Sequence, residues 1–299
     1  VQGQGNTQPK LDKQQDVYAG ILKTIDEGIA NLEKGKALKS VTAQDFLYGG
    51  NVSQWVSFGY ALKARYLLHQ LAVDPSVLAQ AKAAAKKAVE LGFEGASITE
   101  FNGVNCDNPW SAFIWSRYYT ASSKTVADIM AAYSDPRYYY YIYETAAYNP
   151  GVLEIAQVAD GSLAYPEWFD FGSQPLHLFS KAELYFILAE TQLRSNEDAT
   201  EAFQTAVESS VSEIMVLFED EADPAAYAQS LGAPTLKKLF EQKYIAQSYG
   251  EKVGTYNDLR RLKAMGETYV VLKNPNNTQS GINRYPERLP YGNSSVLGN

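Results

Sequence analysis

Residues 179–256 constrain the fold of this chain most strongly, because apolar side chains recur there at the spacing of amphipathic helices. Two S/D-x-x-E patterns, Ser180 with Glu183 and Asp198 with Glu201, divide the stretch. Such patterns are typical of helix starts, since a side-chain oxygen and a returning carboxylate bind amide groups that the first turn leaves unpaired. Each pattern therefore predicts the N-terminus of a helix.

The helix predicted after Ser180 is apolar on two stripes, one with Phe179, Ala182, Phe186, Ala189 and Leu193, the other with Leu184, Ile187 and Leu188. A helix that is apolar on more than one side must lie between other helices. The turn that follows, Arg194 to Glu197, is short, and short connections join antiparallel neighbours. The second helix has apolar residues at helical spacing, at Phe203, Ala206, Val207, Ile214, Leu217 and Phe218.

A third helix is predicted after Pro234, with Thr235 as its N-cap and Gly250 as a left-handed terminator. Helix hairpins of this length, with alanines where helices meet, are typical of tetratricopeptide-like units. The sequence therefore predicts a mainly all-α fold of stacked tetratricopeptide-like helix hairpins, with a loop-rich aromatic face and minor β structure.

Helical spacing also occupies the first third of the chain. One helix is predicted over residues 14–32, ending at Gly35, and a second over about 54–71. The second has a stripe of large residues, Trp55, Phe58, Leu62, Tyr66 and His69. A third, ending near Gly92, presents an alanine face that permits close helix approach, with Ala81, Ala84, Ala85 and Ala88.

The middle of the chain loses this regularity, because proline and glycine recur at spacings that leave room for short elements only. After Gly250 the sequence predicts an irregular segment, with a short β-prone piece at residues 269–272. The predicted organisation is one helical domain over residues 1–299, divided into helical hairpins (11–92), a loop-rich ligand-face insertion (93–175), tetratricopeptide-like helices (176–250) and an irregular C-terminal segment (251–299).

Charge and composition exclude several kinds of site. The net charge is −8 with no basic run, whereas a nucleic-acid face needs clustered Lys and Arg. The single cysteine, Cys106, excludes a disulfide within the chain and a cysteine-based zinc site, and His69 and His177 lack metal-ligand spacing. We therefore expect no metal, no cofactor and no nucleic acid. The 22 tyrosines instead indicate a surface that binds a ligand.

Six sequence pieces, in order, resemble the SusD/RagB family of outer-membrane nutrient-binding lipoproteins, in particular its SusD-like branch. They are QPKLDKQQDVYAGILKTIDEGIANL, DFLYGGNVSQWVSFGYALKARYLL, the SDPR of residues 134–137, KAELYFILAE, EQKYIAQSYGEKVGTYNDLRR and RLPYGN. Each piece alone is weakly specific, but together they extend over essentially the whole chain. Two of them depart mildly from the family pattern, with Tyr256 where Trp is common and Gly292 after Tyr291.

The resemblance implies a helical scaffold on the extracellular face of the cell outer membrane of Bacteroidetes. Such proteins cap a SusC-like TonB-dependent transporter and capture oligosaccharide, or in some members peptide, for import. Family members begin with a signal peptide and a lipid-modified cysteine, and the resemblance here begins in what is usually the middle of the protein. The resemblance therefore implies that the N-terminal part, with its lipid anchor, is absent from this chain.

The candidate ligand residues lie in the loop-rich aromatic segment. Trp110, Trp115, Tyr118 and Tyr119 form a cluster whose flat rings suit the C–H face of a sugar, and nearby amides such as Asn108 suit its hydroxyls. The alternative is that such rings are anchors of the loops in the core. Trp168 is a further candidate for which we favour a structural role.

Two other motifs are better explained by structure than by a ligand. The tyrosine run of residues 138–143 is predicted to be an edge strand packed on the helices. Arg260 and Arg261 with Asp258 have the chemistry of an anion clamp, but an intramolecular ion pair is the favoured interpretation.

Three classes of function compete. The favoured one is a glycan-capture protein without catalytic residues, and a peptide-binding member of the same family is its closest alternative. A glycoside hydrolase would need two carboxylates beside the sugar, for which only Glu167 and Asp170 flank an aromatic residue. A helical-repeat adaptor would place its recognition residues on the helices rather than on aromatic loops.

Overall fold

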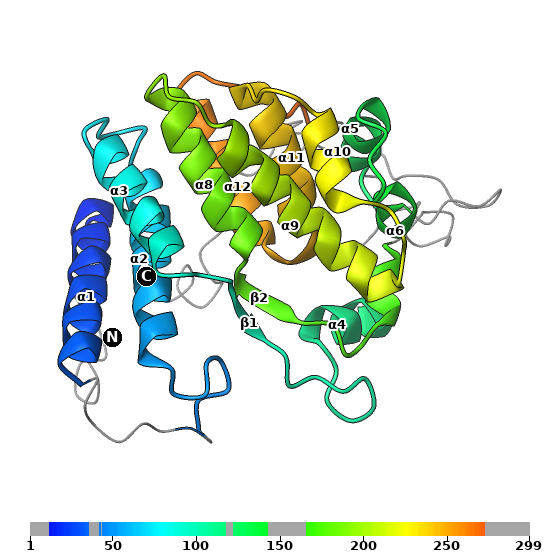
Figure 1. The fold of residues 1–299 in the computed structure, drawn as a ribbon, viewed down its shortest axis with the longest axis horizontal. Helices are drawn as coiled ribbons and strands as arrows, with labels where there is room; N and C mark the ends of the chain where they lie inside the picture. The colour runs from blue at the N-terminus through cyan, green and yellow to red at the C-terminus, as the bar shows by residue number, and fades with distance from the viewer. Residues whose placement is uncertain (1–11, 36–41, 43, 118–121, 143–165, 273–299) are drawn as a thin grey trace, which may run out of the picture.

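A computed structural model describes residues 12–35, 42, 44–117, 122–142 and 166–272, which are mainly helical (Figure 1). The helices are α1 (Gln14–Gly35), α2 (Val52–Leu68), α3 (Val77–Glu90), α4 (Pro109–Arg117), α5 (Lys124–Ala132), α6 (Tyr138–Tyr141), α8 (Lys181–Arg194), α9 (Thr200–Phe218), α10 (Pro224–Ser230), α11 (Leu236–Gly250) and α12 (Lys252–Ala264), with the short 3-10 helix η1 (Glu167–Asp170). β1 (Ala96–Ile98) and β2 (Leu176–Phe179) pair antiparallel. The predicted mainly all-α class is confirmed.

The long helices pack side by side in chain order. α1 packs on α2, α2 on α3 and α8 on α9, and the two groups meet where α2 and α3 contact α8. Figure 1 shows α1 to α3 on one side and α8 to α12 on the other, with β1 and β2 below α8 and α9. In the described part of the chain, no helix combines the length and apolar character needed to cross a membrane.

Small side chains bring α2 and α3 close together. The predicted alanine face of α3 is buried, at Ala81, Ala84, Ala85 and Ala88. On α2 the predicted stripe of large residues is only partly correct, because the buried face consists mostly of smaller residues, Val56, Ser57, Phe58, Ala61, Ala64, Leu67 and Leu68. Close helix contact favours small side chains, so the rings of Trp55 and Tyr66 are only partly buried at its edge.

Ser180 caps α8 as predicted, with its hydroxyl accepting a hydrogen bond from the Glu183 amide at 3.0 Å. The returning carboxylate is not Glu183, however. Glu251 accepts the hydrogen bond from the Ser180 amide at 2.9 Å, because Glu183 forms an ion pair with Arg65 instead. The capping box is thus completed by a residue from another helix junction.

The other predicted helix starts differ in detail. Thr235 caps α11, accepting a hydrogen bond from the Lys238 amide at 3.2 Å. Asp198 accepts a hydrogen bond from the Thr200 amide at 2.9 Å rather than from Glu201, so the second S/D-x-x-E pattern is not a capping box.

Four local predictions are wrong. Residues 252–264 form α12 rather than an irregular segment, and Gly250 does not take a left-handed conformation. The tyrosines at 138–141 form the helical turn α6 rather than an edge strand, while Tyr143 lies outside the described residues. Residues 269–272 are not a strand. The helix α12 escaped prediction because its inward face carries charged rather than apolar side chains.

The SDPR motif explains why the tyrosine run is helical. Asp135 accepts hydrogen bonds from the Arg137 amide at 3.0 Å and from the Arg137 side chain, which closes a turn before α6. The buried guanidinium also donates to Ser210 on α9 at 2.7 Å and to Gln242 on α11 at 3.0 Å. This pairing fixes the start of α6 against two long helices.

Arg261 on α12 confirms the ion-pair interpretation of the NDLRR motif. Its guanidinium donates to both oxygens of Glu190 on α8, at 2.6 and 2.8 Å, and to Asp258 at 2.9 Å. Asp258 also pairs with Lys243 on α11 at 2.6 Å. Burial opposes ionisation, but Lys243 and Arg261 hold the pKa of Asp258 well below its ordinary value. The network therefore joins α8, α11 and α12 through charges.

Arg261 and its exposed neighbour Arg260 form a matched pair for a stability test. Arg261→Ala should lower the free energy of unfolding by about 3–5 kcal/mol, because Glu190 and Asp258 would stay buried while each loses one of its cationic partners. Arg260→Ala should change it by less than about 1 kcal/mol. Denaturant unfolding measures both values, and equal losses would contradict the network's role.

Candidate functional site

A cavity of about 240 Å³, here called the aromatic pocket, lies where the loop-rich segment meets α11 and α12. It is lined by side chains from the α5, α6 and η1 region and from these two helices, namely Ser122, Ser123, Val126, Tyr141, Ile142, Pro166, Trp168, Tyr244, Ser248, Lys252 and Thr255. Rings and hydroxyl groups thus share one cavity, which is the composition expected of a site for a polar ligand with apolar faces.

Rings in edge-to-face contact form the buried wall of the aromatic pocket. Trp168 is 2% exposed and packs edge-on against Tyr141, with ring centroids 4.1 Å apart, and against Tyr249 at 5.3 Å. The Ser122 hydroxyl donates to the carbonyl oxygen of Tyr141 at 2.5 Å, which ties the start of α5 to the end of α6. These ring contacts and this hydrogen bond therefore hold the wall of the aromatic pocket in place.

Trp110 and Lys252 meet beside the aromatic pocket. The Lys252 Nζ lies 4.3 Å from the centroid of the Trp110 ring, a cation–π distance, and donates to the carbonyl oxygen of Tyr249 at 3.2 Å. Burial lowers the pKa of Lys252 to about 8. Trp110 itself is partly exposed at the start of α4. The lysine thus holds an accessible indole next to the cavity.

The structure separates the predicted ligand residues. Trp110 lies beside the aromatic pocket, and Trp168 is buried in its wall rather than presented as a platform. Trp115 lies on α4, but its side chain is outside the described part of the structure, as are Tyr118 and Tyr119.

The side chain of Asn108 is buried and forms hydrogen bonds within the protein. It is 1% exposed, and its Oδ1 accepts a hydrogen bond from the Trp110 amide at 2.8 Å. Its Nδ2 donates to the carbonyl oxygens of Gln174 and Pro175, at 3.1 and 3.2 Å. Asn108 therefore does not offer its amide to a ligand. It fixes the start of α4 and so positions Trp110.

Sequence reasoning missed the α11–α12 contribution to the aromatic pocket. Tyr244 and Ser248 lie one turn apart on α11, and Lys252 and Thr255 lie at the start of α12. These residues lie within the family-like piece of residues 241–261, but that piece indicates no ligand role for them, and α12 was not predicted. Tyr244, Ser248 and Lys252 are spaced four residues apart. This spacing places the three side chains on one helix face only if α11 and α12 are nearly continuous.

The junction between α11 and α12 is fixed by the buried Glu251 carboxyl. It accepts hydrogen bonds from the Ser180 amide at 2.9 Å and from the Ser180 hydroxyl at 2.6 Å, and it lies 3.5 Å from Arg65. Burial, together with the charge and hydrogen bond of Glu183, raises the pKa of Glu251 to about 8. The carboxyl group of Glu251 is therefore mostly protonated near neutral pH. Glu251 directly precedes Lys252 in the sequence.

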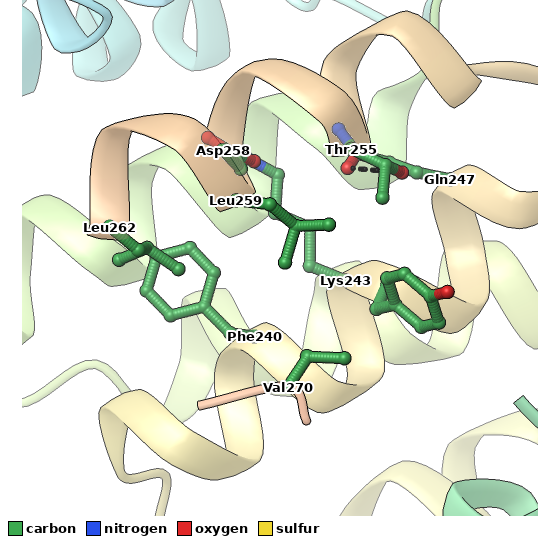
Figure 2. Close-up of a pocket in the computed structure, with 9 residues that line it drawn as sticks. Phe240, Lys243, Gln247, Thr255, Asp258, Leu259, Leu262 and Val270 are labelled. Atoms are coloured by element: carbon green, nitrogen blue, oxygen red, sulfur yellow. Dashed lines mark hydrogen bonds and ion pairs between the residues drawn. The ribbon is translucent and has the colours of Figure 1, made fainter. Parts of the chain in front are cut away.

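A second crevice between α11 and α12 is too small for a ligand (Figure 2). Its volume is about 10 Å³, which is room for no more than one water molecule. Figure 2 shows Lys243 reaching from α11 toward Asp258 on α12, and the Thr255 hydroxyl donating to Gln247 at 3.2 Å. This crevice is a packed joint between helices rather than a binding site.

Comparison with known proteins places these features in a family. A model of a SusD-like family, described as starch-binding and associating with the outer membrane, matches residues 1–292. A solved SusD/RagB family protein from Bacteroides thetaiotaomicron is 27% identical, with a TM-score of 0.78, and the match covers 99% of this chain and 70% of that protein. No curated protein matches the chain.

Two further solved structures share the fold at lower identity. One is a chitin-binding protein, 21% identical with a TM-score of 0.75, matched over 97% of this chain and 68% of that one. The other is a chitin-binding SusD homolog from Flavobacterium johnsoniae, 22% identical with a TM-score of 0.68, matched over 87% of this chain and 63% of that one.

The raised pKa of Glu251 gives a testable pH dependence. Between its ordinary value near 4.5 and about 8, the folded protein keeps a proton that the unfolded chain releases. The free energy of unfolding should therefore fall as pH rises through this window, by up to about 1.4 kcal/mol per pH unit, relative to Glu251→Gln. Glutamine mimics the protonated carboxyl. Denaturant unfolding at several pH values measures the difference, and a constant difference would show that Glu251 is ionised throughout.

Proposed function

Since the chain belongs to the SusD-like family, we propose that it is a glycan-binding protein of the outer cell surface that captures oligosaccharide without altering it. The supporting observation is the Trp110 indole, which Lys252 and Asn108 hold beside a cavity lined by serine, threonine and tyrosine hydroxyls. An apolar ring face suits the C–H face of a pyranose, and the hydroxyls suit its polar edge.

The lining of the aromatic pocket favours binding over hydrolysis. Glycoside hydrolysis uses two carboxylates that flank the scissile bond. Among the described residues that line the pocket there is no aspartate or glutamate, and the charged group present is Lys252. Lysine and hydroxyl groups orient a sugar but do not supply the acid and base of that reaction. Of the candidate functions, glycan capture without catalysis fits this lining best.

The wider role that we propose follows the family. The full-length protein would be lipid-anchored on the extracellular face of the outer membrane and would present its glycan to a SusC-like TonB-dependent transporter. Chitin binding by two proteins of the same fold makes chitooligosaccharide a second glycan to test beside starch fragments. A peptide ligand is the alternative within the family.

Affinity electrophoresis and calorimetry against soluble starch, chitooligosaccharides and other polysaccharides test the proposal, with reducing ends assayed afterwards. We expect binding of at least one glycan with no release of sugar. Release of reducing ends would instead indicate a hydrolase. Binding of a peptide library with no glycan bound would replace the glycan with a peptide ligand.

Trp110 and Phe113 on α4 provide a matched pair of aromatic substitutions. Trp110→Ala should weaken glycan binding by about tenfold or more, because the indole face is lost, while circular dichroism shows unchanged helix content. Phe113→Ala removes a ring that is 45% exposed on the same helix, and it should leave affinity within about twofold. Equal affinities of wild type and Trp110→Ala would remove Trp110 from the site.

A further inference from the structure

A cleft larger than the aromatic pocket adjoins the ring wall at Tyr249. It has a volume of about 570 Å³ and is bounded by β1, β2, the start of α8 and one face of α9. Tyr249 belongs to its lining, and the same ring packs against Trp168 of the aromatic pocket and, at 5.6 Å, against His177 of the cleft. The cleft is of ligand-binding size and distinct from the aromatic pocket.

The α9 face of this cleft has an unusual composition for an exposed helix face. Residues at helical spacing point into it, namely Thr205, Glu208, Ser209, Ser212, Glu213 and Val216. Exposed helix faces are commonly filled by long charged side chains, which cover the surface beneath them. Here three small hydroxyl residues leave the space open, so the cleft is lined with short hydrogen-bonding groups.

The charges of the cleft favour a ligand that donates hydrogen bonds. Lys181 pairs with Glu94 at 2.7 Å, and His177 pairs with Glu213, so both cationic groups are already engaged. Glu208 is exposed and has no ion-pair partner in the described part of the chain. The cleft therefore has an excess of acceptors, which disfavours phosphate or carboxylate ligands and suits hydroxyl groups.

Two buried side chains also direct polar groups to this region. Tyr249 is 6% exposed, and its hydroxyl has no hydrogen-bond partner among the described residues. Buried hydroxyls are rarely left in this condition, so the Tyr249 hydroxyl can still form a hydrogen bond with a polar group. His177 is held in one orientation, with Nδ1 2.7 Å from the Ser97 hydroxyl and Nε2 on Glu213. A preset polar wall of this kind is expected of a binding site.

We infer that this cleft is a second saccharide site, in which hydroxyl groups of a neutral glycan donate hydrogen bonds to the carboxylates of Glu208 and Glu213. This inference rests on the proposed function and extends it. The aromatic pocket would contact the apolar face of a sugar ring, whereas the cleft would bind the hydroxyl groups at the edge of a sugar ring. A glycan engaged at both places gains avidity without any new contact.

The two histidines of the chain make the test specific. His177 lines the cleft, while His69 packs on the rings of Tyr18 and Tyr66, far along the chain on the α2 side. Imidazole C–H resonances, assigned with His69→Gln, are followed by NMR during titration with maltoheptaose and with chitopentaose, and calorimetry runs in parallel. We expect the glycan that binds to shift His177 and to leave His69 unmoved.

Variants separate the two sites. Ser212→Phe fills the cleft and should abolish the shift of the His177 resonance. Glu208→Gln should weaken the glycan affinity, measured from that shift, about tenfold. Glu201→Gln, the same charge change on α9 outside the cleft lining, should have no effect, and Trp110→Ala should retain the shift. Calorimetric binding that never moves His177 would overturn the cleft site and leave the proposed function standing. No binding of any glycan would overturn both.

Discussion

The fold depends on the partly buried Arg65 guanidinium, which contacts groups from three separate parts of the chain. Arg65 on α2 pairs with Glu183 on α8, donates to the carbonyl oxygen of Leu178 on β2, and stacks 3.8 Å above the Phe179 ring. Glu251 closes the same cluster from the α11–α12 junction. A charge taken out of water must be paired and hydrogen-bonded, so these segments can meet only in this one arrangement.

Two buried arginines likewise join separate helices elsewhere in the fold. Arg137 joins the turn before α6 to α9 and α11, and Arg261 joins α12 to α8. Two of the groups that we propose for ligand binding are close in sequence to these ion pairs. Lys252 follows Glu251 directly, and the wall ring Tyr141 lies one turn after Arg137. The binding groups are thus on loops and helix ends whose positions are set by buried ion pairs, which is how a site stays preorganised.

Sequence reasoning recovered the features that apolar periodicity and local capping control. The long helices, the alanine face of α3 and the caps at Ser180 and Thr235 follow from spacing and side-chain chemistry. The helix α12 and the α6 turn could not be predicted in this way, because charged networks through Arg261 and Arg137 stabilise them instead of an apolar face. Whether a carboxylate such as Glu183 returns to its own helix start depends on a distant arginine, which no local pattern reveals.

The candidate site was predictable only in part for the same reason. Trp110 was chosen as an aromatic residue beside polar amides, and the structure places it next to a cavity. Asn108 instead caps α4, and the role of Lys252 depends on a helix junction that only the folded chain brings near Trp110. Asn108 and Trp110 are close in sequence and lie together in the fold, whereas residues contributed by distant helices, such as Lys252, have no local signal.

The most direct test of the account is a crystal structure of this chain with a soluble oligosaccharide that it binds. We expect a sugar ring packed on the Trp110 indole, with its hydroxyls within hydrogen-bonding distance of Lys252, Ser248 or Thr255. A glycan bound elsewhere, with Trp110 and Lys252 unchanged and without contact to sugar, would contradict the assignment of the aromatic pocket as the capture site.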